Sequence, residues 1–362
     1  MEKIKKILVV AVLALTLVGI FALHVALPDG TVSDAERRPL AQLPELTADG
    51  VFSGDYFEEL EEYLLDQFPL RESFRRLKAN FQTKVLGLKA NNGIYLVDGH
   101  LSKLEYPLKA SQAKLAIDRF NAIIDSHPQL GKVYYSLIPD KNYFMAAANG
   151  YPAMDYAALL AQAAGIRAEY IDIFPLLELD DYYRTDSHWR QEKVLDVAQQ
   201  LAAAMGTAVD GMDKYTAESR DGFRGVYYGQ SALNLPAETL TILKSDVTQS
   251  AIVKSAEHAA NMPVYNWDDF ANTDPYDVYL SGAEALITMD NPLQTNGRHL
   301  ILFRDSFGSS ISPLLLSGYS KVTVVDIRYM SSSLLDQYVD FTDADVLFLY
   351  CTSMFNAGAT LK

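Results

Sequence analysis

The sequence predicts an α/β fold with a doubly wound, mainly parallel sheet, preceded by a membrane anchor and a helical arm. Three observations lead to this prediction. The chain opens on an uninterrupted apolar stretch, residues 7–23. The next segment, to about residue 92, contains helical periodicity but no strand-like run. From residue 93 onward, short apolar runs alternate with helical patterns, and this alternation is typical of a parallel sheet covered on both faces.

The N-terminal stretch predicts a membrane anchor over residues 1–29. Lys3, Lys5 and Lys6 precede the apolar stretch, which extends to Leu27 with one histidine, His24, in it. A signal peptide and a transmembrane helix both fit such an opening. The stretch is longer than the roughly 7–15 apolar residues of a signal peptide, and no clear Ala-x-Ala cleavage site follows. We therefore expect an uncleaved anchor with its lysines in the cytoplasm, the alternative being secretion after signal cleavage. Either way, the remainder lies outside the cytoplasm.

Residues 30–92 predict a stalk followed by an amphipathic helical arm. The stalk, residues 30–52, contains prolines and few periodic apolar positions, so it is expected to be extended. Apolar residues then recur at helical spacing within 55–68 and again within 70–86. The first of these helices is rich in acidic residues and the second in basic ones.

Residues 93–362 predict the α/β domain itself. The predicted strands are residues 94–97, 133–138, 168–173, 300–304, 321–327 and 345–350. The predicted helices are residues 111–126, 155–164, 189–205, 307–317 and 331–339. A mixed, turn-rich insert is expected at about 207–297. In sheets of this kind, binding sites form beyond the carboxyl ends of the strands.

Composition limits the classes of function. Apolar residues make up 49% and charged residues 21% of the 362, which indicates a globular protein. The net charge is −15, from 31 basic and 46 acidic side chains. Nucleic acid is therefore not an expected partner, because binding it requires a basic surface. The one cysteine, Cys351, excludes an intrachain disulfide and is interpreted as a small buried apolar residue.

Two short segments carry the expected chemistry. Asp186-Ser187-His188-Trp189 places a carboxylate two residues before an imidazole, and Arg304-Asp305-Ser306-Phe307 places a serine directly after a predicted strand. A nucleophilic hydroxyl needs a base to take its proton, and the base needs a group that fixes its tautomer. Ser306, His188 and Asp186 could fill these three roles, which predicts a serine-dependent acyl-transfer enzyme.

Simpler interpretations of the same residues remain open. Ser306 alone could cap a helix, and Asp186 could cap the helix expected from residue 189. A metal site is a further alternative for His188, but no neighbouring cluster completes a ligand set. Gly308 follows Ser306 in a predicted first helical turn, whose backbone N–H groups could stabilise an oxyanion. Arg328 and Tyr329 follow another predicted strand and could bind substrate on the same rim, whereas a structural ion pair is the alternative for the arginine.

The two segments also resemble known families. They are similar to motifs of the SGNH-like periplasmic proteins of alginate O-acetylation, and more closely to the DHHW family of Gram-positive cell-envelope proteins. Ser187 stands where the Asp-His-His-Trp motif has its first histidine, and Arg304 where SGNH enzymes usually place glycine. The resemblance covers most of the chain after about residue 33, including residues 36–41, 66–71 and 326–329. It also includes the segment around Tyr228, which implies that this tyrosine faces the site.

The resemblance implies extracytoplasmic O-acetylation of a cell-envelope polysaccharide, without a cofactor or metal. It further implies an integral membrane acyltransferase as partner, which exports the acetyl group. A carbohydrate acetylesterase would use the same three residues and pass the acetyl group to water instead. A non-catalytic glycan-binding or scaffold protein of an envelope complex is the alternative from another class, although a pure binder does not require Ser306, His188 and Asp186 together.

Overall fold

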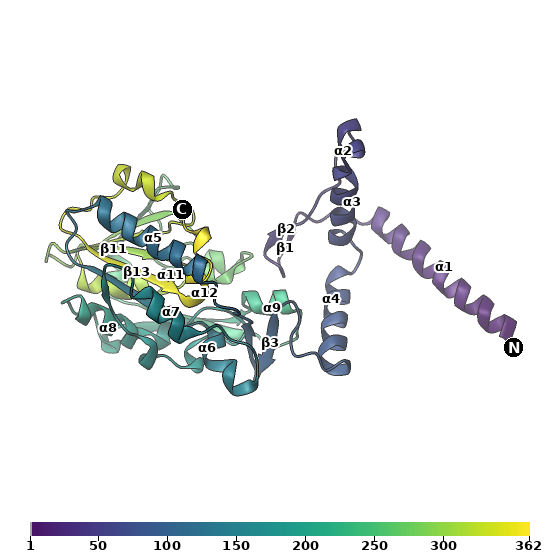
Figure 1. Ribbon diagram of the computed structural model, residues 1–362, viewed down its shortest axis with the longest axis horizontal. Helices are drawn as coiled ribbons and strands as arrows, with labels where there is room; N and C mark the ends of the chain where they lie inside the picture. The colour runs from purple at the N-terminus through teal and green to yellow at the C-terminus, as the bar shows by residue number, and fades with distance from the viewer. Residues whose placement is uncertain (1) are drawn as a thin grey trace. The chain divides into compact units, whose positions relative to one another are not determined.

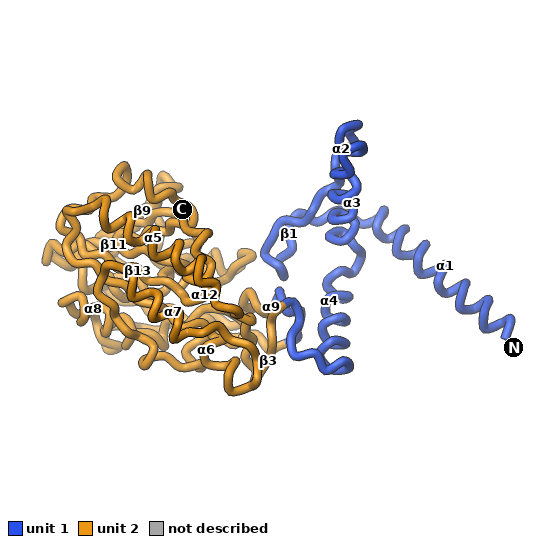
Figure 2. The backbone as a smooth tube through the Cα atoms, in the orientation of Figure 1, with its two compact units in different colours: residues 1–92, 229–234 blue, residues 93–228, 235–362 orange. Residues whose placement is uncertain are grey.

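A computed structural model describes residues 2–362, which separate into two compact units. One unit holds the chain up to Asn92 together with Gly229–Asn234, and the other holds Gly93–Tyr228 and Leu235–Lys362 (Figure 2). The short segment 229–234 is therefore distant in sequence from the rest of its unit. We call the two units the arm and the α/β unit.

The arm begins with the long apolar helix α1, Glu2–Ala26 (Figure 1). Its 25 residues span about 37 Å at 1.5 Å per residue, enough to cross the hydrocarbon core of a bilayer. Its hydropathy reaches 2.7, and none of its side chains is buried. Within residues 2–362 it is the one helix that is long and apolar enough to cross a membrane. A signal sequence has the same properties.

The rest of the arm is short helices and turns. Its other elements are β1 (Val32–Ser33), β2 (Arg38–Pro39), α2 (Ala48–Ser53), α3 (Asp55–Asp66), α4 (Arg71–Asn80) and a π-helical extension of α4 (Phe81–Val85). The two amphipathic helices predicted from sequence correspond to α3 and to α4 with its extension. The segment predicted as an extended stalk instead contains the small β1–β2 pair and α2, which Thr47 caps through its hydroxyl.

An ion-pair network holds the arm together. Asp66, at the end of α3, accepts two hydrogen bonds from the Arg38 guanidinium, at 2.6 and 2.7 Å. Glu36 lies 2.7 Å from Arg71 and 3.2 Å from Arg75 on α4. The guanidinium groups lower the pKa of Asp66 to about 2, because they stabilise its carboxylate. Glu36, Arg38, Asp66 and Arg71 belong to two of the family-like motifs, so the motifs have a structural role within the arm.

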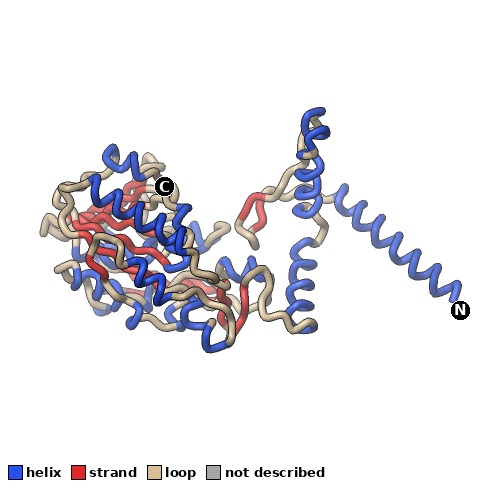
Figure 3. The backbone as a smooth tube through the Cα atoms, in the orientation of Figure 1, coloured by secondary structure: helices blue, strands red, loops and turns tan. Residues whose placement is uncertain are grey.

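The α/β unit is built on a seven-stranded sheet with the order β6-β5-β13-β11-β12-β10-β9. Figure 3 shows the strands of this unit in red between blue helices. Its strands are β5 (Val133–Ile138), β6 (Glu169–Tyr170), β9 (Ile252–Ser255), β10 (Leu286–Asp290), β11 (His299–Arg304), β12 (Lys321–Val325) and β13 (Asp345–Cys351). The five strands from β6 to β12 run parallel, while β10 and β9 complete one edge in antiparallel pairing. The predicted mainly parallel α/β sheet is confirmed.

Helices cover both faces of this sheet, as a doubly wound fold requires (Figure 1). The principal helices are α5 (Ala110–Ser126), α6 (Lys141–Met145), α7 (Tyr156–Ala163), α8 (Leu195–Ala204), α10 (Asp246–Ser250), α11 (Gly308–Leu315) and α12 (Thr352–Phe355). The short helix α9 (Val226–Ser231) begins in this unit and ends in the segment 229–234 that belongs to the arm. Helices α5 and α7 share one hydrophobic cluster with the sheet, and α8 and α11 share the other.

Some elements differ from the sequence-based expectation. The strand predicted at 94–97 is β3 (Ile94–Val97), but it pairs with β4 (His100–Lys103) in a separate hairpin. The helix predicted from residue 189 begins at Leu195, because Trp189 pairs with Tyr182 in an isolated bridge. The segment predicted as a helix at 331–339 forms 3-10 turns. The turn-rich stretch 207–297 contributes the hairpin of β7 (Thr216–Phe223) and β8 (Glu238–Lys244), and it also supplies β9 and β10.

Candidate active site

A pocket of about 300 Å³ lies where three parallel strands end. Ser306 follows β11, Cys351 is the last residue of β13, and Asp140 follows β5. The pocket is lined by Lys103, Glu105, Lys109, Asp140, Ser187, Tyr227, Asp305, Ser306, Phe307, Cys351, Ser353, Met354, Asn356 and Ala357. Its position beyond the carboxyl ends of the strands is the one that the topology favours.

Ser306, His188 and Asp186 form a continuous hydrogen-bonded chain at the wall of this pocket. The Ser306 hydroxyl lies 2.7 Å from His188 Nε2, and Asp186 Oδ1 lies 2.5 Å from His188 Nδ1. Asp186 is fully buried, and His188 is 6% exposed. With its proton on Nδ1, the imidazole donates to Asp186 and leaves Nε2 to accept the proton of the serine hydroxyl. This arrangement can activate the hydroxyl as a nucleophile.

Backbone amides hold the carboxylate of Asp186 in place. Oδ1 also accepts the His188 N–H at 2.9 Å, and Oδ2 accepts the Val226 N–H at 2.7 Å. Gly225 packs directly on this carboxylate, since a Cβ at residue 225 would lie 2.2 Å from Asp186 Cβ. Both carboxylate oxygens therefore have donors, and the residue before Val226 must be glycine for the approach to be so close.

Aromatic side chains fix the plane of the imidazole. The Tyr276 ring stacks on His188 with 4.0 Å between centroids and 9° between planes, and Phe307 lies 4.9 Å away. The Tyr276 hydroxyl donates to Ser310 Oγ, which also accepts from Trp189 Nε1 at 2.8 Å. Trp189 is fully buried and packs against Phe307, with 5.3 Å between the ring centroids. A ring held on its face and at both nitrogens has little freedom to turn away from Ser306.

The turn that presents Ser306 is braced by its neighbours. The Asp305 carboxylate accepts the Phe307 N–H at 3.1 Å and the Cys351 N–H at 2.7 Å, so it links the ends of two strands. Burial raises the pKa of Asp305. The Gly308 N–H, suggested from sequence as an oxyanion donor, donates to the Asp305 carbonyl instead. A Cβ at Gly308 would lie 2.4 Å from Arg304 Cβ, so this glycine is required by packing.

Arg328 and Tyr329, which the sequence placed as candidates on a substrate rim, are not among the residues that line this pocket. The Arg328 guanidinium makes three hydrogen bonds to the buried Asp326 carboxylate, at 2.6, 2.9 and 3.2 Å, and Asp326 raises the pKa of Arg328 against the effect of burial. Asp326 also lies 3.4 Å from Arg304, which is fully buried. The structural ion pair considered for Arg328 is thus the arrangement observed. Arg304, which stands where glycine was expected, fills space behind the turn.

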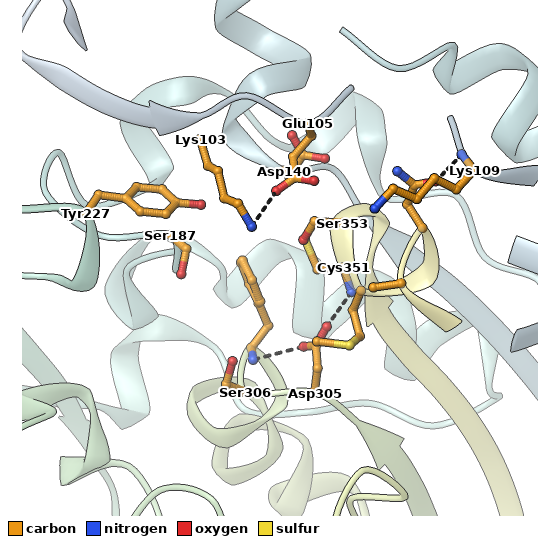
Figure 4. Close-up of a pocket in the computed structure, with 14 residues that line it drawn as sticks. Lys103, Glu105, Lys109, Asp140, Ser187, Tyr227, Asp305, Ser306, Cys351 and Ser353 are labelled. Carbon is orange, nitrogen blue, oxygen red and sulfur yellow. Dashed lines mark hydrogen bonds and ion pairs between the residues drawn. The ribbon is translucent and has the colours of Figure 1, made fainter. Parts of the chain in front are cut away.

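Tyr227, not Tyr228, is the tyrosine of its segment that lines the pocket. Figure 4 shows Tyr227 and Lys103 across the pocket from Ser306 and Asp305. Tyr228 lies beside the Arg224 guanidinium, 5.2 Å from its ring centroid. Two adjacent tyrosines predict an aromatic wall of the pocket. Which of the two rings faces the pocket depends on how α9 packs. No pattern in the sequence indicated that Tyr276, in the turn-rich stretch, would lie at the site.

The charged groups around the pocket are of both signs. Burial raises the pKa of Glu105, and Lys103 lies 3.6 Å from its carboxylate. Asp140 is buried and accepts from Thr352 and Tyr156, yet burial still raises its pKa. The pocket can therefore offer carboxyl groups that take up protons more readily than usual, and donors for the oxygen atoms of a ligand.

Cys351 lines the pocket but is buried, and burial raises the pKa of its thiol well above the usual value. A thiol in that state is a poor nucleophile. Among residues 2–362, no group of three or more His, Cys, Asp or Glu side chains is placed to hold a metal ion.

Comparison with known proteins identifies the same region. Residues 176–325, which include Asp186, His188 and Ser306, match the family model described as DHHW protein. No curated protein matches the chain.

Solved structures share the fold at low identity. A DHHW family protein from Eubacterium siraeum is 19% identical with a TM-score of 0.60, covering 75% of this chain and 94% of its own. Bacillus cereus PatB1, solved with a sulfonyl adduct, is 17% identical with a TM-score of 0.60, covering 72% of this chain and 95% of its own. The resemblance to the DHHW family is therefore confirmed: residues 176–325 match its family model, and the chain shares an α/β fold with a solved DHHW family protein.

Proposed function

We propose that the protein is an extracytoplasmic, serine-dependent acyltransferase that O-acetylates a cell-envelope polysaccharide. The observation that carries this proposal is the chain of hydrogen bonds from Asp186 through His188 to the Ser306 hydroxyl, at the wall of a pocket. The same groups in the same order serve nucleophilic acyl transfer in unrelated folds. The likeness to the DHHW family agrees with a role at the cell envelope, and the likeness to PatB1 supports the fold.

In the proposed cycle, Ser306 Oγ attacks the carbonyl carbon of an acetyl donor while its proton moves to His188 Nε2. Asp186 stabilises the imidazolium that forms. The tetrahedral intermediate collapses, and the leaving oxygen takes the proton from His188, which leaves acetyl-Ser306. A sugar hydroxyl then attacks this ester and gives its proton to His188, and Ser306 Oγ leaves with that proton. The Tyr227 side chain and the Lys103 ammonium line the pocket and could donate to oxygens of either substrate.

The proposed location follows from the arm. Helix α1 serves as an uncleaved anchor, so that the α/β unit works at the outer face of the membrane, where envelope polysaccharide is available. An integral membrane acyltransferase that exports acetyl groups is the proposed partner, and envelope polysaccharide the proposed acceptor. Both rest on the family resemblance.

The test is ester turnover by the full-length chain in detergent. The wild type should hydrolyse p-nitrophenyl acetate, and phenylmethylsulfonyl fluoride should modify Ser306, as located by peptide mass spectrometry. Ser306→Ala should abolish both signals. The matched control is Ser353→Ala, because Ser353 lines the same pocket but its hydroxyl donates to Cys351 Sγ. Unchanged turnover in the Ser306 variant would overturn the nucleophile assignment.

Carbohydrate acetylesterase activity is the second candidate, since water can take the place of the sugar hydroxyl in the same cycle. The two are separated by supplying envelope oligosaccharides together with the acetyl donor. A transferase should yield acetylated sugar in preference to free acetate, whereas an esterase should release acetate alone. A wild type that binds glycan without any ester turnover would favour the scaffold function.

A further inference from the structure

One buried lysine, Lys141, binds backbone carbonyl groups of the loop that carries Asp186. Lys141 Nζ donates to the carbonyl oxygens of Tyr183, Arg184 and Asp186, at 2.7, 3.2 and 3.0 Å. Lys141 is 2% exposed and is the first residue of α6, after the N-cap Asp140. An ammonium has three protons and no acceptor, so these three carbonyls use its whole donor capacity.

A carboxylate binds the amide groups of the same loop. Glu238, on β8, accepts the Arg184 N–H at 2.6 Å and the Thr185 N–H at 2.8 Å. Its Oε2 also accepts the Thr185 hydroxyl at 2.6 Å. The Thr185 Oγ1 in turn accepts the N–H of Gly225, the residue that packs on Asp186. The loop is therefore held by a cation at its carbonyls and by an anion at its amides.

Burying the charged side chain of Lys141 at this position is unfavourable in free energy. A cation at the first position of a helix opposes the helix dipole, and full burial disfavours its charged form. Burial lowers the pKa of Lys141 to about 7, while Asp186 and Glu238 favour its protonated form. Two other titratable groups face it: His100, and Tyr227, whose ring centroid lies 5.7 Å from Nζ. A buried charge at an unfavourable helix position is expected where the function of the protein requires it.

We propose that Lys141 and Glu238 are positioning residues, which hold the 183–186 loop so that Asp186 and His188 stay in line with Ser306. Neither side chain contacts the Ser306 hydroxyl, and neither takes a proton in the cycle. Their role is to fix the backbone from which the general base and its orienting carboxylate project, and it rests on the proposed function. A misplacement of about 1 Å in such a group typically reduces the rate about 10²-fold.

The test combines kinetics with a signal that does not need turnover. We expect Lys141→Met to lower kcat for p-nitrophenyl acetate about 100-fold with KM within about twofold of wild type, because geometry and not binding is lost. Glu238→Gln should lower kcat about 10-fold, since an amide oxygen can replace part of the carboxylate. Proton NMR of the full-length chain should show a downfield resonance from the His188 Nδ1 proton bound to Asp186. This resonance should be missing in Lys141→Met and reduced in Glu238→Gln.

Two control variants match these substitutions. Lys114→Met removes an exposed lysine of α5 that pairs with Asp118, and Glu218→Gln removes a carboxylate on β7 that pairs with Lys244. Both should keep the kinetics and the downfield resonance of the wild type. If Lys141→Met does not fold, as circular dichroism would show, the partly exposed Glu238 provides the decisive variant.

The outcomes separate this inference from the proposed function. A downfield resonance that persists in both variants, with kcat unchanged, would overturn the positioning role. A wild type without that resonance would overturn it too, because there would be no Asp186–His188 bond to position. If the wild type shows the resonance, Lys141→Met loses it and Glu238→Gln weakens it, but the wild type turns over no ester, the positioning role is supported and the acyltransferase refuted.

Discussion

Gly225 offers a direct test of how closely Asp186 must be packed. A Cβ at residue 225 would lie 2.2 Å from Asp186 Cβ and 2.4 Å from its Cα and Oδ2. Non-bonded carbon atoms rest about 3.5–4.0 Å apart, so Gly225→Ala must open the contact by roughly 1.3–1.8 Å. The φ of Gly225 is not in the left-handed region, so the strain comes from the contact and not from the backbone.

Displacing Asp186 would disturb the hydrogen bonds that orient His188. The Val226 N–H donates to Asp186 at 2.7 Å, and Asp186 Oδ1 lies 2.5 Å from His188 Nδ1. A shift of more than about 1 Å breaks either bond, since hydrogen bonds weaken beyond about 3.2 Å. We expect Gly225→Ala to lower kcat about 10²-fold, or about 2.7 kcal/mol in barrier height. Overpacking should also cost about 1–3 kcal/mol in the free energy of unfolding.

The assay is steady-state hydrolysis of p-nitrophenyl acetate, with thermal melting measured on the same samples. Gly211→Ala is the matched control, because its Cβ would meet only the exposed Asp213 carboxylate, at 2.9 Å. That side chain can turn away, so both activity and stability should stay near wild type. A Gly225→Ala protein with kcat within threefold of wild type and an unchanged Tm would refute the reasoning.

Three further predictions follow from the site and the arm. His188→Ala should reduce turnover as severely as Ser306→Ala, and the double variant should lose little more, since groups that act as one catalytic unit are non-additive; additive losses in kcat would contradict a shared role. The pKa of Asp66 is lowered to about 2, so its contribution of about 1–2 kcal/mol to arm stability is present above pH 4 and is lost as the pH falls toward 2. Asp66→Asn should remove this acid dependence from proteolysis of the arm, and an unchanged pH profile would exclude the ion pair as its cause. Finally, trypsin applied to intact, wall-stripped cells should release a fragment that lacks about the first thirty residues; protection of the whole chain until lysis would refute the proposed topology.

The sequence by itself determined the local elements and the place of the nucleophile. Alternating apolar runs predicted β5, β11, β12 and β13 with helices between them, because burial on both faces leaves continuous apolar strands. Since parallel strands connected through helices end on one edge, Ser306 after β11 had to lie at the rim where sites form. The spacing of Asp186 and His188 suggested a carboxylate–imidazole pair because two residues suffice for the side chains to meet.

Tertiary structure decided which side chains surround those three residues. Lys141, Glu238 and Tyr276 reach the site from elements separated by about 50 to 90 residues from His188 in sequence, and no local pattern encodes such contacts. The choice of Tyr227 over Tyr228 depends on which face of a six-residue helix packs inward, and a helix that short has too few turns to show periodicity. Arg328 pairs with the buried Asp326, because a buried carboxylate needs a partner, and only the tertiary structure shows that Asp326 is buried. Local propensity and periodicity thus predicted the strands and the nucleophile, whereas packing and the satisfaction of buried charge decided the surroundings that orient it.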